Sequence, residues 1–413
     1  MQLTWQSPGA LSRTELCSVV ETMYSLSYIY RATGERSFAD RCEKTAFNAL
    51  PVMVMPDWWS HQYVAQTNQP MSLPLARPPF RNVNGRGQTY GLEPHYPCCT
   101  TNHPQGYPKF LSASFVKVGP NGLGHALLSP GKVSTTLGQG NDNNVTVDCE
   151  TNYPFGLLFL YTIETQRPFD FYVRVPEWYI AEDSFARVSS SDSEISKGLI
   201  VDPDPVTGML HVAVGKGTTK ITYKLGARIK IEPRMNGSIA IHHGALLYAL
   251  EIGTATTSMP ALDWRYQRRL PSNRVVPQVH DHIIRNTTVW AVAIDPSTLR
   301  FQTNTPESSE TVERLPNPIF QEGAPPTSIT GMACEINWGY HSKGVPKEPP
   351  GPGRHKCISD RFTVKLVPYG AAKIHIAEFP TANLPADDDD HLADQPVISS
   401  GGTGPQSPLA REL

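Results

Sequence analysis

Apolar residues follow a helical spacing only near the beginning of the 413-residue chain. Within residues 14–34 they recur at i, i+3, i+4, i+7 and i+10, and so form one stripe: Leu16, Val19, Val20, Met23 and Leu26. The run Ser12-Arg13-Thr14-Glu15 predicts a capping box at the start of this helix, and Gly34 predicts its end. A second helix is expected at residues 37–50, before Pro51, so that the two form a helical hairpin.

The pattern changes twice after these helices. Residues 51–108 have no regular period, and a structureless stretch of this length is typical of a functional site. From residue 110 the apolar positions alternate with period two and are broken by Gly, Pro and Asn, which predicts short antiparallel strands. The 38 prolines also favour strands and turns over long helices.

We therefore expect an α+β multidomain protein. Its parts are a helical region with the irregular loop at 1–108, a β-sandwich at 109–255, a second sandwich or completing strands at 256–380, and a disordered tail at 381–413. The acidic run at 387–390 in that tail is interpreted as a solvated segment rather than a cation site.

Charge and cysteine content narrow the function classes. The formal net charge of −2 excludes general electrostatic capture of nucleic acid or anionic membrane as the main activity. No run approaches the roughly 18 apolar residues that a spanning helix needs, and the first residues lack the features of a signal peptide. We therefore expect a cytoplasmic, reducing location. There Cys334 and Cys357 are expected to be unpaired thiols, although they could pair in an oxidising compartment.

The most informative candidate chemistry is Glu15-Leu16-Cys17 together with Cys98-Cys99. Three thiols and one carboxylate supply the four ligands that tetrahedral zinc takes, and sulfur favours zinc over Mg²⁺ or Ca²⁺. From spacing alone two other readings stay open, because adjacent cysteines can also be buried apolar residues or a vicinal disulfide.

Several longer segments bear on this choice. The first three are TELCSVVETMYSL, HQYVAQTNQP and GLEPHYPCCTTNHPQGYPKF, and they are followed by TNYPF, FYVRVPEW, IAIHHGALLYALEI and LVPYGAAKIHIAEFP. Together these segments resemble glycoside hydrolase family 127, the β-L-arabinofuranosidase group. They occur in the family's order and span about residues 11–380. The resemblance implies the last part of an (α/α)₆ catalytic barrel followed by β-sandwich domains. It also implies zinc (Zn²⁺) held by Glu15, Cys17, Cys98 and Cys99.

The same resemblance implies a reaction. Cys98 matches the nucleophile of a retaining hydrolysis of β-L-arabinofuranosides or related sugars, with a glutamate as acid and base. In the family that glutamate lies upstream of Glu-x-Cys, whereas residues 1–14 here contain no Asp or Glu. We therefore expect an N-terminally truncated member with impaired activity. A second copy or a complementing partner is expected to cover the helical remnant.

Five further residues are candidate substrate contacts, each with a purely structural alternative as a loop or pocket-wall residue: Glu93, His95, Tyr96, His61 and Gln66. Two other functions remain open. One is a non-catalytic carbohydrate-binding or scaffold protein built on the sandwiches, and the other is a thiol-redox protein that uses Cys98 and Cys99.

Overall fold

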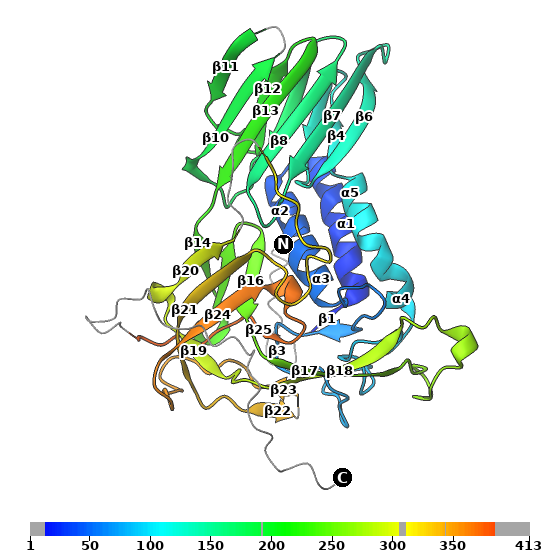
Figure 1. Cartoon of the computed structure of the whole chain (residues 1–413), viewed down its shortest axis with the longest axis vertical. Coiled ribbons are helices and arrows are strands. Elements are labelled where there is room, and N and C mark those ends of the chain that lie inside the picture. The colour runs from blue at the N-terminus through cyan, green and yellow to red at the C-terminus, as the bar shows by residue number, and fades with distance from the viewer. Residues whose placement is uncertain (1–12, 191–192, 305–310, 343, 385–413) are drawn as a thin grey trace.

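The computed structural model describes residues 13–190, 193–304, 311–342 and 344–384, and the side chains of 193–197 are left aside. It consists of a small helical layer and several β-sheets (Figure 1). The expected disordered tail lies outside the described residues from position 385 onward. None of the described helices combines the length and apolar composition that crossing a bilayer requires.

The helical layer begins with α1 (Leu16–Thr33), whose predicted stripe is buried. Gly34 ends α1 as predicted: it has φ 74° and donates its N–H to the Tyr30 carbonyl over 2.7 Å. The predicted capping box is wrong, because Glu15 is itself the N-cap and its carboxylate makes no capping hydrogen bond. Ser12, the first member of that box, lies outside the described residues.

The second helical segment is longer than predicted. It runs through α2 (Arg36–Lys44), a π-helical turn at Thr45–Ala49 and α3 (Leu50–Val52). Pro51 does not stop it, because it lies in the first turn of α3, where a backbone N–H is not required. Two short helices, α4 (Cys98–Asn102) and α5 (Gly106–Ser112), follow the irregular loop and are joined by a 3₁₀ turn at His103–Gln105. No (α/α)₆ barrel forms among the described residues.

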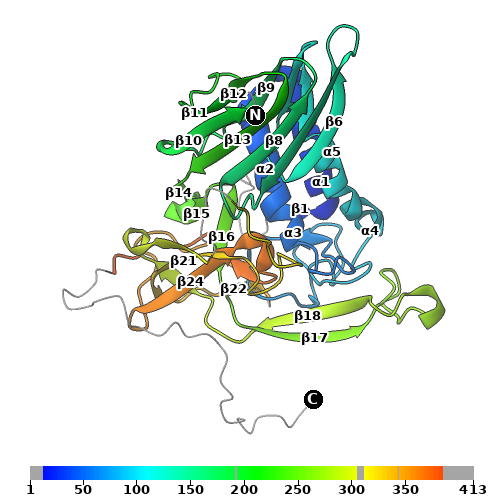
Figure 2. The ribbon, with the colours of Figure 1, turned by 45° about the horizontal axis from the view of Figure 1, so that its top comes forward.

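Two sheets pack face to face above the helices (Figures 1 and 2). The first has the order β11 (Ser193–Leu199), β10 (Ile180–Ser190), β13 (Gly217–Gly226), β8 (Leu158–Thr165), β7 (Asn143–Thr151), β6 (Gly131–Leu137). The second has the order β12 (Met209–Val214), β9 (Phe169–Arg174), β5 (Gly122–His125), β4 (Phe115–Val118). Neighbouring strands are antiparallel except β5 and β9, which are parallel. These two sheets span residues 115–226, within the region 109–255 where the alternating pattern predicts a β-sandwich.

A third, seven-stranded sheet lies below the sandwich. Its order is β14 (Ile229–Pro233), β15 (Ile239–His243), β16 (Leu246–Leu250), β24 (Phe362–Pro368), β21 (Thr327–Glu335), β19 (Val292–Ile294), and β20 (Arg300–Thr303) also pairs with β21. This sheet crosses residue 255, where the sequence pattern placed a domain boundary.

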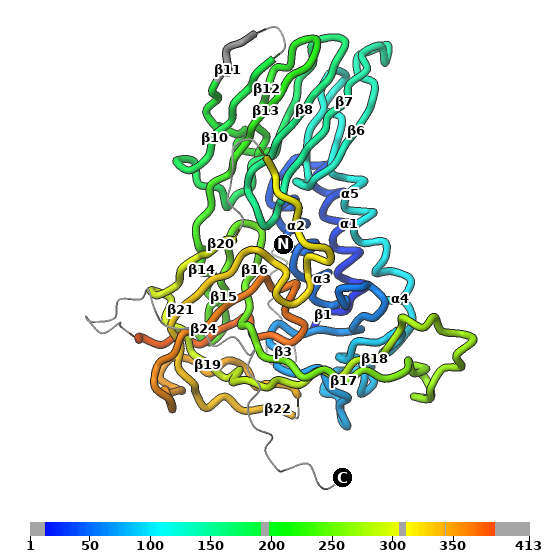
Figure 3. Tube along the Cα trace, in the orientation of Figure 1, coloured from blue at the N-terminus to red at the C-terminus, as the bar shows by residue number. Residues whose placement is uncertain are grey.

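Four strand pairs complete the described fold. They are β1 (Thr14–Glu15) with β2 (Val64–Ala65), β3 (Asn68–Gln69) with β25 (His375–Ile376), β17 (Thr254–Pro260) with β18 (His280–Asn286), and β22 (Tyr340–Ser342) with β23 (Val345–Pro346). The β17–β18 pair and its connecting residues 261–279 form a long hairpin, which we call the hairpin arm. The tube in Figure 3 shows the arm running beneath the irregular loop toward α4.

A buried ion cluster fixes α2 on the sandwich. Arg174 of β9 is fully buried and pairs with both Asp40 and Glu43 of α2, and its Nε donates to the Ala126 carbonyl over 2.7 Å. The Tyr153 hydroxyl donates to Glu43 over 2.5 Å. Burial raises the pKa of Glu43, while the guanidinium of Arg174 opposes that shift.

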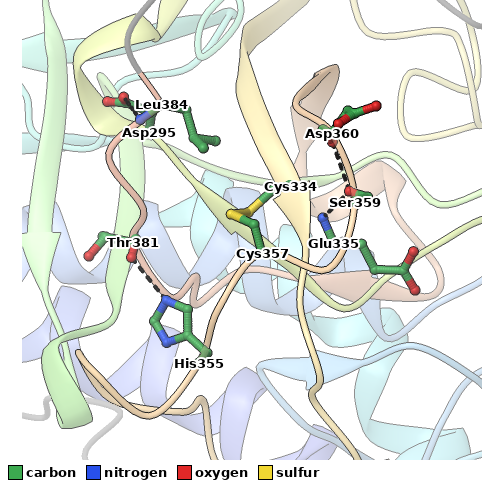
Figure 4. The surroundings of a disulfide bond; sticks show 9 residues. All are labelled: Asp295, Cys334, Glu335, His355, Cys357, Ser359, Asp360, Thr381 and Leu384. Atoms are coloured by element: carbon green, nitrogen blue, oxygen red, sulfur yellow. Dashed lines mark hydrogen bonds between the residues drawn. A yellow bond between two sulfur atoms is a disulfide. The ribbon is translucent and has the colours of Figure 1, made fainter.

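The expectation that Cys334 and Cys357 are unpaired is wrong, because the structure joins them in a disulfide (Figure 4). Their Cα atoms lie 5.5 Å apart, within the ordinary range for a bridge. Backbone pairing brings them together: Ile358 donates its N–H to the Glu335 carbonyl over 2.8 Å, and Ile336 forms a bridge with Cys357. The 23-residue separation between the two cysteines concealed this pairing in the sequence.

Candidate metal and catalytic site

Residues from two distant segments meet at the start of α1 and α4. The ligand atoms of Glu15, Cys17, Cys98 and Cys99 all lie within 4.8 Å of one another. The Cys17 sulfur is 3.3 Å from that of Cys99, and the Cys98 sulfur is 3.8 Å from that of Cys99. The Cys98 sulfur also lies 3.7 Å from Glu15 Oε1. The four residues singled out in the sequence are thus brought together.

Local structure explains how these side chains converge. Glu15 is extended and pairs with Val64, so that its carboxylate points away from the helix that it caps. Cys17 occupies the first turn of the 18-residue helix α1, where the helix dipole favours a thiolate. Cys98 is the first residue of α4, after Pro97, and the short helix turns both adjacent cysteines toward α1.

The three thiols of the cluster differ in pKa. The pKa of Cys17 is lowered to about 6, chiefly because the Cys99 thiol donates a hydrogen bond to its sulfur. The bond to Cys17 raises the pKa of Cys99, and burial together with Cys17 raises the pKa of Cys98 to about 11. Three sulfurs this close cannot all ionise unless a cation compensates their charge.

The donor set fits zinc. With Zn–S bonds of about 2.3 Å, two sulfurs of a tetrahedral site lie about 3.8 Å apart. The Cys98–Cys99 separation of 3.8 Å matches this value, the Cys17–Cys99 separation of 3.3 Å is shorter, and Glu15 Oε1 lies 3.7 Å from the Cys98 sulfur. A Cys₃-carboxylate set is soft enough to favour zinc over the hard cations Mg²⁺ and Ca²⁺.

A second set of contacts orients the cluster. The side chain of Tyr63 hydrogen-bonds to Glu15, and burial together with this carboxylate raises the tyrosine pKa. Asn102 hydrogen-bonds to the Cys17 sulfur. His103 Nδ1 lies 3.0 Å from the Cys99 carbonyl, so this ring fixes the backbone of α4. No sequence pattern connected Tyr63 with the four candidate ligands, because its position beside Glu15 depends on the pairing of β1 with β2.

The five predicted substrate contacts occupy different places. Tyr96 is 54% exposed, and its carbonyl oxygen lies 3.9 Å from the Cys98 sulfur. The ring of His95 packs edge-on against Tyr63, with their centroids 4.6 Å apart. Glu93 is partly buried, and burial together with Asp263 raises its pKa. No described contact joins Glu93 to the four ligands.

His61 and Gln66 lie beneath the site rather than on its surface. His61 is fully buried, and its Nε2 is 3.2 Å from the Thr100 hydroxyl of α4. Gln66 is 4% exposed and accepts a hydrogen bond of 2.7 Å from the Gln88 side chain. Both positions suit residues that support the loop, and a direct contact with substrate stays a prediction for them.

One wall of the site comes from a segment that the sequence did not connect with it. Trp264 in the hairpin arm packs edge-on against Tyr96, with a centroid separation of 5.6 Å, and against His95 at 6.0 Å. Its carbonyl accepts a hydrogen bond of 3.4 Å from Asn84. Because Trp264 follows Cys98 by more than 160 residues, no local pattern could have revealed this contact.

A separate cavity of about 680 Å³ lies on another face of α1, against α5, β4, β9 and β12. Its lining includes four tyrosines: Tyr24, Tyr28, Tyr30 and Tyr172. None of the four candidate metal ligands lines it.

The fold resembles solved glycoside hydrolases. A GH127 β-L-arabinofuranosidase from Geobacillus stearothermophilus T6 aligns over 92% of this chain and 51% of its own, with 13% identity and a TM-score of 0.56. A second GH127 β-arabinofuranosidase aligns over 92% of this chain and 51% of its own, with 14% identity and a TM-score of 0.58. A protein described as a glycoside hydrolase aligns over 92% of this chain and 54% of its own, also with 14% identity and a TM-score of 0.58. The chain thus spans about half the length of these structures. No family profile and no curated protein matched the sequence.

Proposed function

We propose that this chain, which has a GH127-like fold, carries the nucleophile and the metal site of a retaining glycosidase acting on β-L-arabinofuranosides or related sugars. The observation that carries the proposal is the convergence of Glu15, Cys17, Cys98 and Cys99 within 4.8 Å. The three solved structures support it through their shared fold.

In this proposal Cys98 is the nucleophile. Its sulfur lies at the start of α4 and is partly exposed, with Tyr96 beside it. The thiolate forms a bond to the anomeric carbon while the bond to the leaving oxygen breaks, and that oxygen takes a proton from an acid. Water then displaces the sulfur and gives its proton to the conjugate base of that acid, so that the sugar leaves with its original configuration and the thiolate is restored.

The metal ligands in this proposal are Glu15, Cys17, Cys98 and Cys99, and a bound Zn²⁺ would supply the positive charge that keeps these thiols ionised near neutral pH. Tyr63 and Asn102 orient Glu15 and Cys17 through hydrogen bonds. Such outer contacts fix the direction of ligand lone pairs and the basicity of the ligands.

The acid/base group is not assigned to any residue of this sequence. Such a group typically contributes about 10²–10⁴ in rate. We further propose that residues 1–108 are part of an (α/α)₆ catalytic barrel, with the sheets as accessory domains.

A labelling experiment tests the nucleophile without requiring turnover. The full chain, loaded with Zn²⁺, is treated with an electrophilic β-L-arabinofuranosyl reagent and digested for mass spectrometry. We expect one modification, at Cys98, which Cys98→Ser abolishes and the control Cys149→Ala retains, because Cys149 is a buried thiol outside the cluster. Labelling elsewhere, or equal labelling of Cys98→Ser, would refute the role of Cys98.

Metal analysis tests the ligands separately. We expect one zinc per chain in the wild type and in Cys149→Ala, and loss of zinc in Cys17→Ala. Replacement of zinc by Co²⁺ should give sulfur-to-metal charge-transfer absorption. A zinc content that Cys17→Ala leaves unchanged would contradict the proposed ligand set.

The tyrosine-lined cavity favours a second candidate, non-catalytic binding of carbohydrate. A volume of about 680 Å³ lies within the range of small-molecule sites, and aromatic rings stack well on sugars. Tyr28, 55% exposed, is the best ring to test. Under this alternative, Tyr28→Ala weakens binding of arabino-oligosaccharides in calorimetry, whereas Cys98→Ser leaves it unchanged.

A further inference from the structure

The hairpin arm extends from the seven-stranded sheet to the thiol cluster and is docked there by named contacts. His282 donates its N–H to the Tyr90 carbonyl over 2.7 Å, and Ser72 and Ile284 exchange two backbone bonds of 2.8 and 3.0 Å. Arg86 pairs with Asp281 at 2.9 Å, and both side chains are largely buried. These contacts dock the arm against the irregular loop that precedes Cys98 (Figures 2 and 3).

The tip of the arm forms an aromatic edge beside the candidate nucleophile. Trp264 touches Tyr96, which lies two residues before Cys98, and it also touches His95. His95 in turn packs against Tyr63, whose side chain bonds to the ligand Glu15. This continuous row of rings leads from the thiols to the surface, and the exposed end suits stacking of a sugar next to the cleaved one.

The same tip is strongly cationic. Residues 261–279 contain four arginines and one aspartate, a local charge of +3 in a chain whose net charge is −2. The Asp263 carboxylate is occupied in the turn, where it accepts the N–H groups of Arg265 and Tyr266 at 2.8 Å. The four arginines are exposed, and none forms an ion pair with a carboxylate in the part of the chain that the structure describes: Arg265, Arg268, Arg269 and Arg274.

Two further arginines extend this charge along the neighbouring loop. Arg13, two residues before Glu15, donates to the carbonyl of Arg81 over 2.9 Å, and both are exposed. Asn82, the next residue, accepts a bond of 2.9 Å from His95. We call these six arginines, Arg13, Arg81 and the four of the arm, the arginine collar. Glu93 and Asp263 are close enough for their charges to interact, and neither forms an ion pair with these arginines among the described contacts.

We propose that the glycan bound at this site carries carboxylates next to the cleaved sugar, as in a uronic-acid-containing polysaccharide. The arginine collar pairs with those carboxylates, and Trp264 and Tyr96 stack on the adjoining ring. This inference rests on the proposed function and adds the charge of the substrate to it. Arg265 lies over the Trp264 ring at 5.1 Å, which places one guanidinium directly at the aromatic edge. Arginines with no carboxylate partner among the described residues favour bidentate recognition of planar carboxylates over a neutral glycan.

Affinity electrophoresis of the full chain tests the inference. Native gels contain polygalacturonate, neutral arabinan or no polysaccharide. We expect retardation by polygalacturonate at low salt that weakens as NaCl is raised, because ion pairing at an exposed surface is screened. The triple variant Arg265→Gln/Arg268→Gln/Arg269→Gln should bind polygalacturonate about tenfold more weakly.

A matched control carries the same change of charge at the opposite end of the molecule. The variant Arg187→Gln/Lys216→Gln/Lys220→Gln alters β10, β13 and the turn before β13, and should bind polygalacturonate as the wild type does. Equal weakening by both variants would overturn the inference, because it would show a net-charge effect. Equal retardation of the wild type by arabinan, or equal affinity for a DNA oligonucleotide, would also overturn it.

Two further readouts separate this inference from the proposed function. Trp264→Ala should weaken polygalacturonate binding, and Trp264→Phe should restore most of it, as expected for stacking. The triple arginine variant should keep one zinc per chain and labelling at Cys98. If both are kept while polygalacturonate binding is unchanged, the charge inference fails and the proposed function stands. If Cys98 is never labelled in the wild type, the proposed function fails.

Discussion

Replacing Arg174 by methionine tests how the helical layer is held on the sandwich. The Arg174 side chain is fully buried, and its guanidinium contacts Asp40 and Glu43 of α2 as well as the Ala126 carbonyl. Methionine has a similar length and no charge, so Arg174→Met keeps much of the volume. It removes the only guanidinium that these two carboxylates contact within the described residues.

The magnitude follows from the burial of the partners. Asp40 is 7% exposed and Glu43 is fully buried, so their charges would be left in a low-dielectric interior. Removing one partner of a buried ion pair typically costs about 3–5 kcal/mol. We expect a loss of this size in the free energy of unfolding at pH 7, a large part of the stability of an ordinary domain.

The pH dependence gives the prediction a sign. Burial already raises the pKa of Glu43, and loss of the guanidinium removes the contact that opposes this shift. A carboxyl whose pKa is higher in the folded state binds its proton more tightly there, so stability is gained as the pH falls through the folded-state pKa toward the unfolded-state pKa. The deficit of Arg174→Met should therefore shrink between pH 7 and pH 5.

Urea unfolding followed by tryptophan fluorescence measures this. The double variant Glu43→Gln/Arg174→Met should recover part of the loss at pH 7, because it removes the uncompensated charge. The reasoning is refuted if Arg174→Met lies within about 1 kcal/mol of the wild type at pH 7, or if its deficit grows as the pH is lowered.

Three further predictions concern the site, the disulfide and the docking of the hairpin arm. Zinc affinity, measured by competition with a chromophoric chelator, should fall as the pH is lowered from 7 to 5, because protons compete with zinc for the thiolates. The pKa of Cys17 is about 6, so even this thiol becomes protonated within that range. A zinc affinity that does not change with pH would exclude thiolate ligands. Cys334→Ser/Cys357→Ser should lower the urea midpoint by the equivalent of about 3 kcal/mol, and an unchanged midpoint would count against the bond. Gly91→Ala places a Cβ 2.5 Å from Asp281 Oδ1 and should cost about 1–3 kcal/mol; thermal melts that match the wild type would show that the arm can move aside.

The sequence predicts features that local spacing encodes. The stripe beginning at Leu16 and the left-handed residue Gly34 define α1, because helical period and glycine conformation are local properties. Period-two alternation likewise identifies most strands of the sandwich. The four candidate metal ligands were predicted from residue chemistry and a family resemblance, and the structure brings all four together.

Features that depend on distant pairing were missed. Glu15 fits a capping box by sequence, yet its pairing with Val64 directs the carboxylate toward Cys98 instead. Trp264 reaches the site only because a 33-residue hairpin, β17 to β18, extends out of another sheet. Nothing near either residue in the sequence encodes those contacts, since they arise from registers set elsewhere in the chain.

The docking of the hairpin arm has a consequence for biosynthesis. The cysteines at positions 17, 98 and 99 are synthesised well before strand β18. This strand covers the irregular loop through the hydrogen bond between His282 and Tyr90. Domains form progressively as the nascent polypeptide emerges. During that interval the three thiols lack this cover and are accessible to oxidants, until translation passes residue 286.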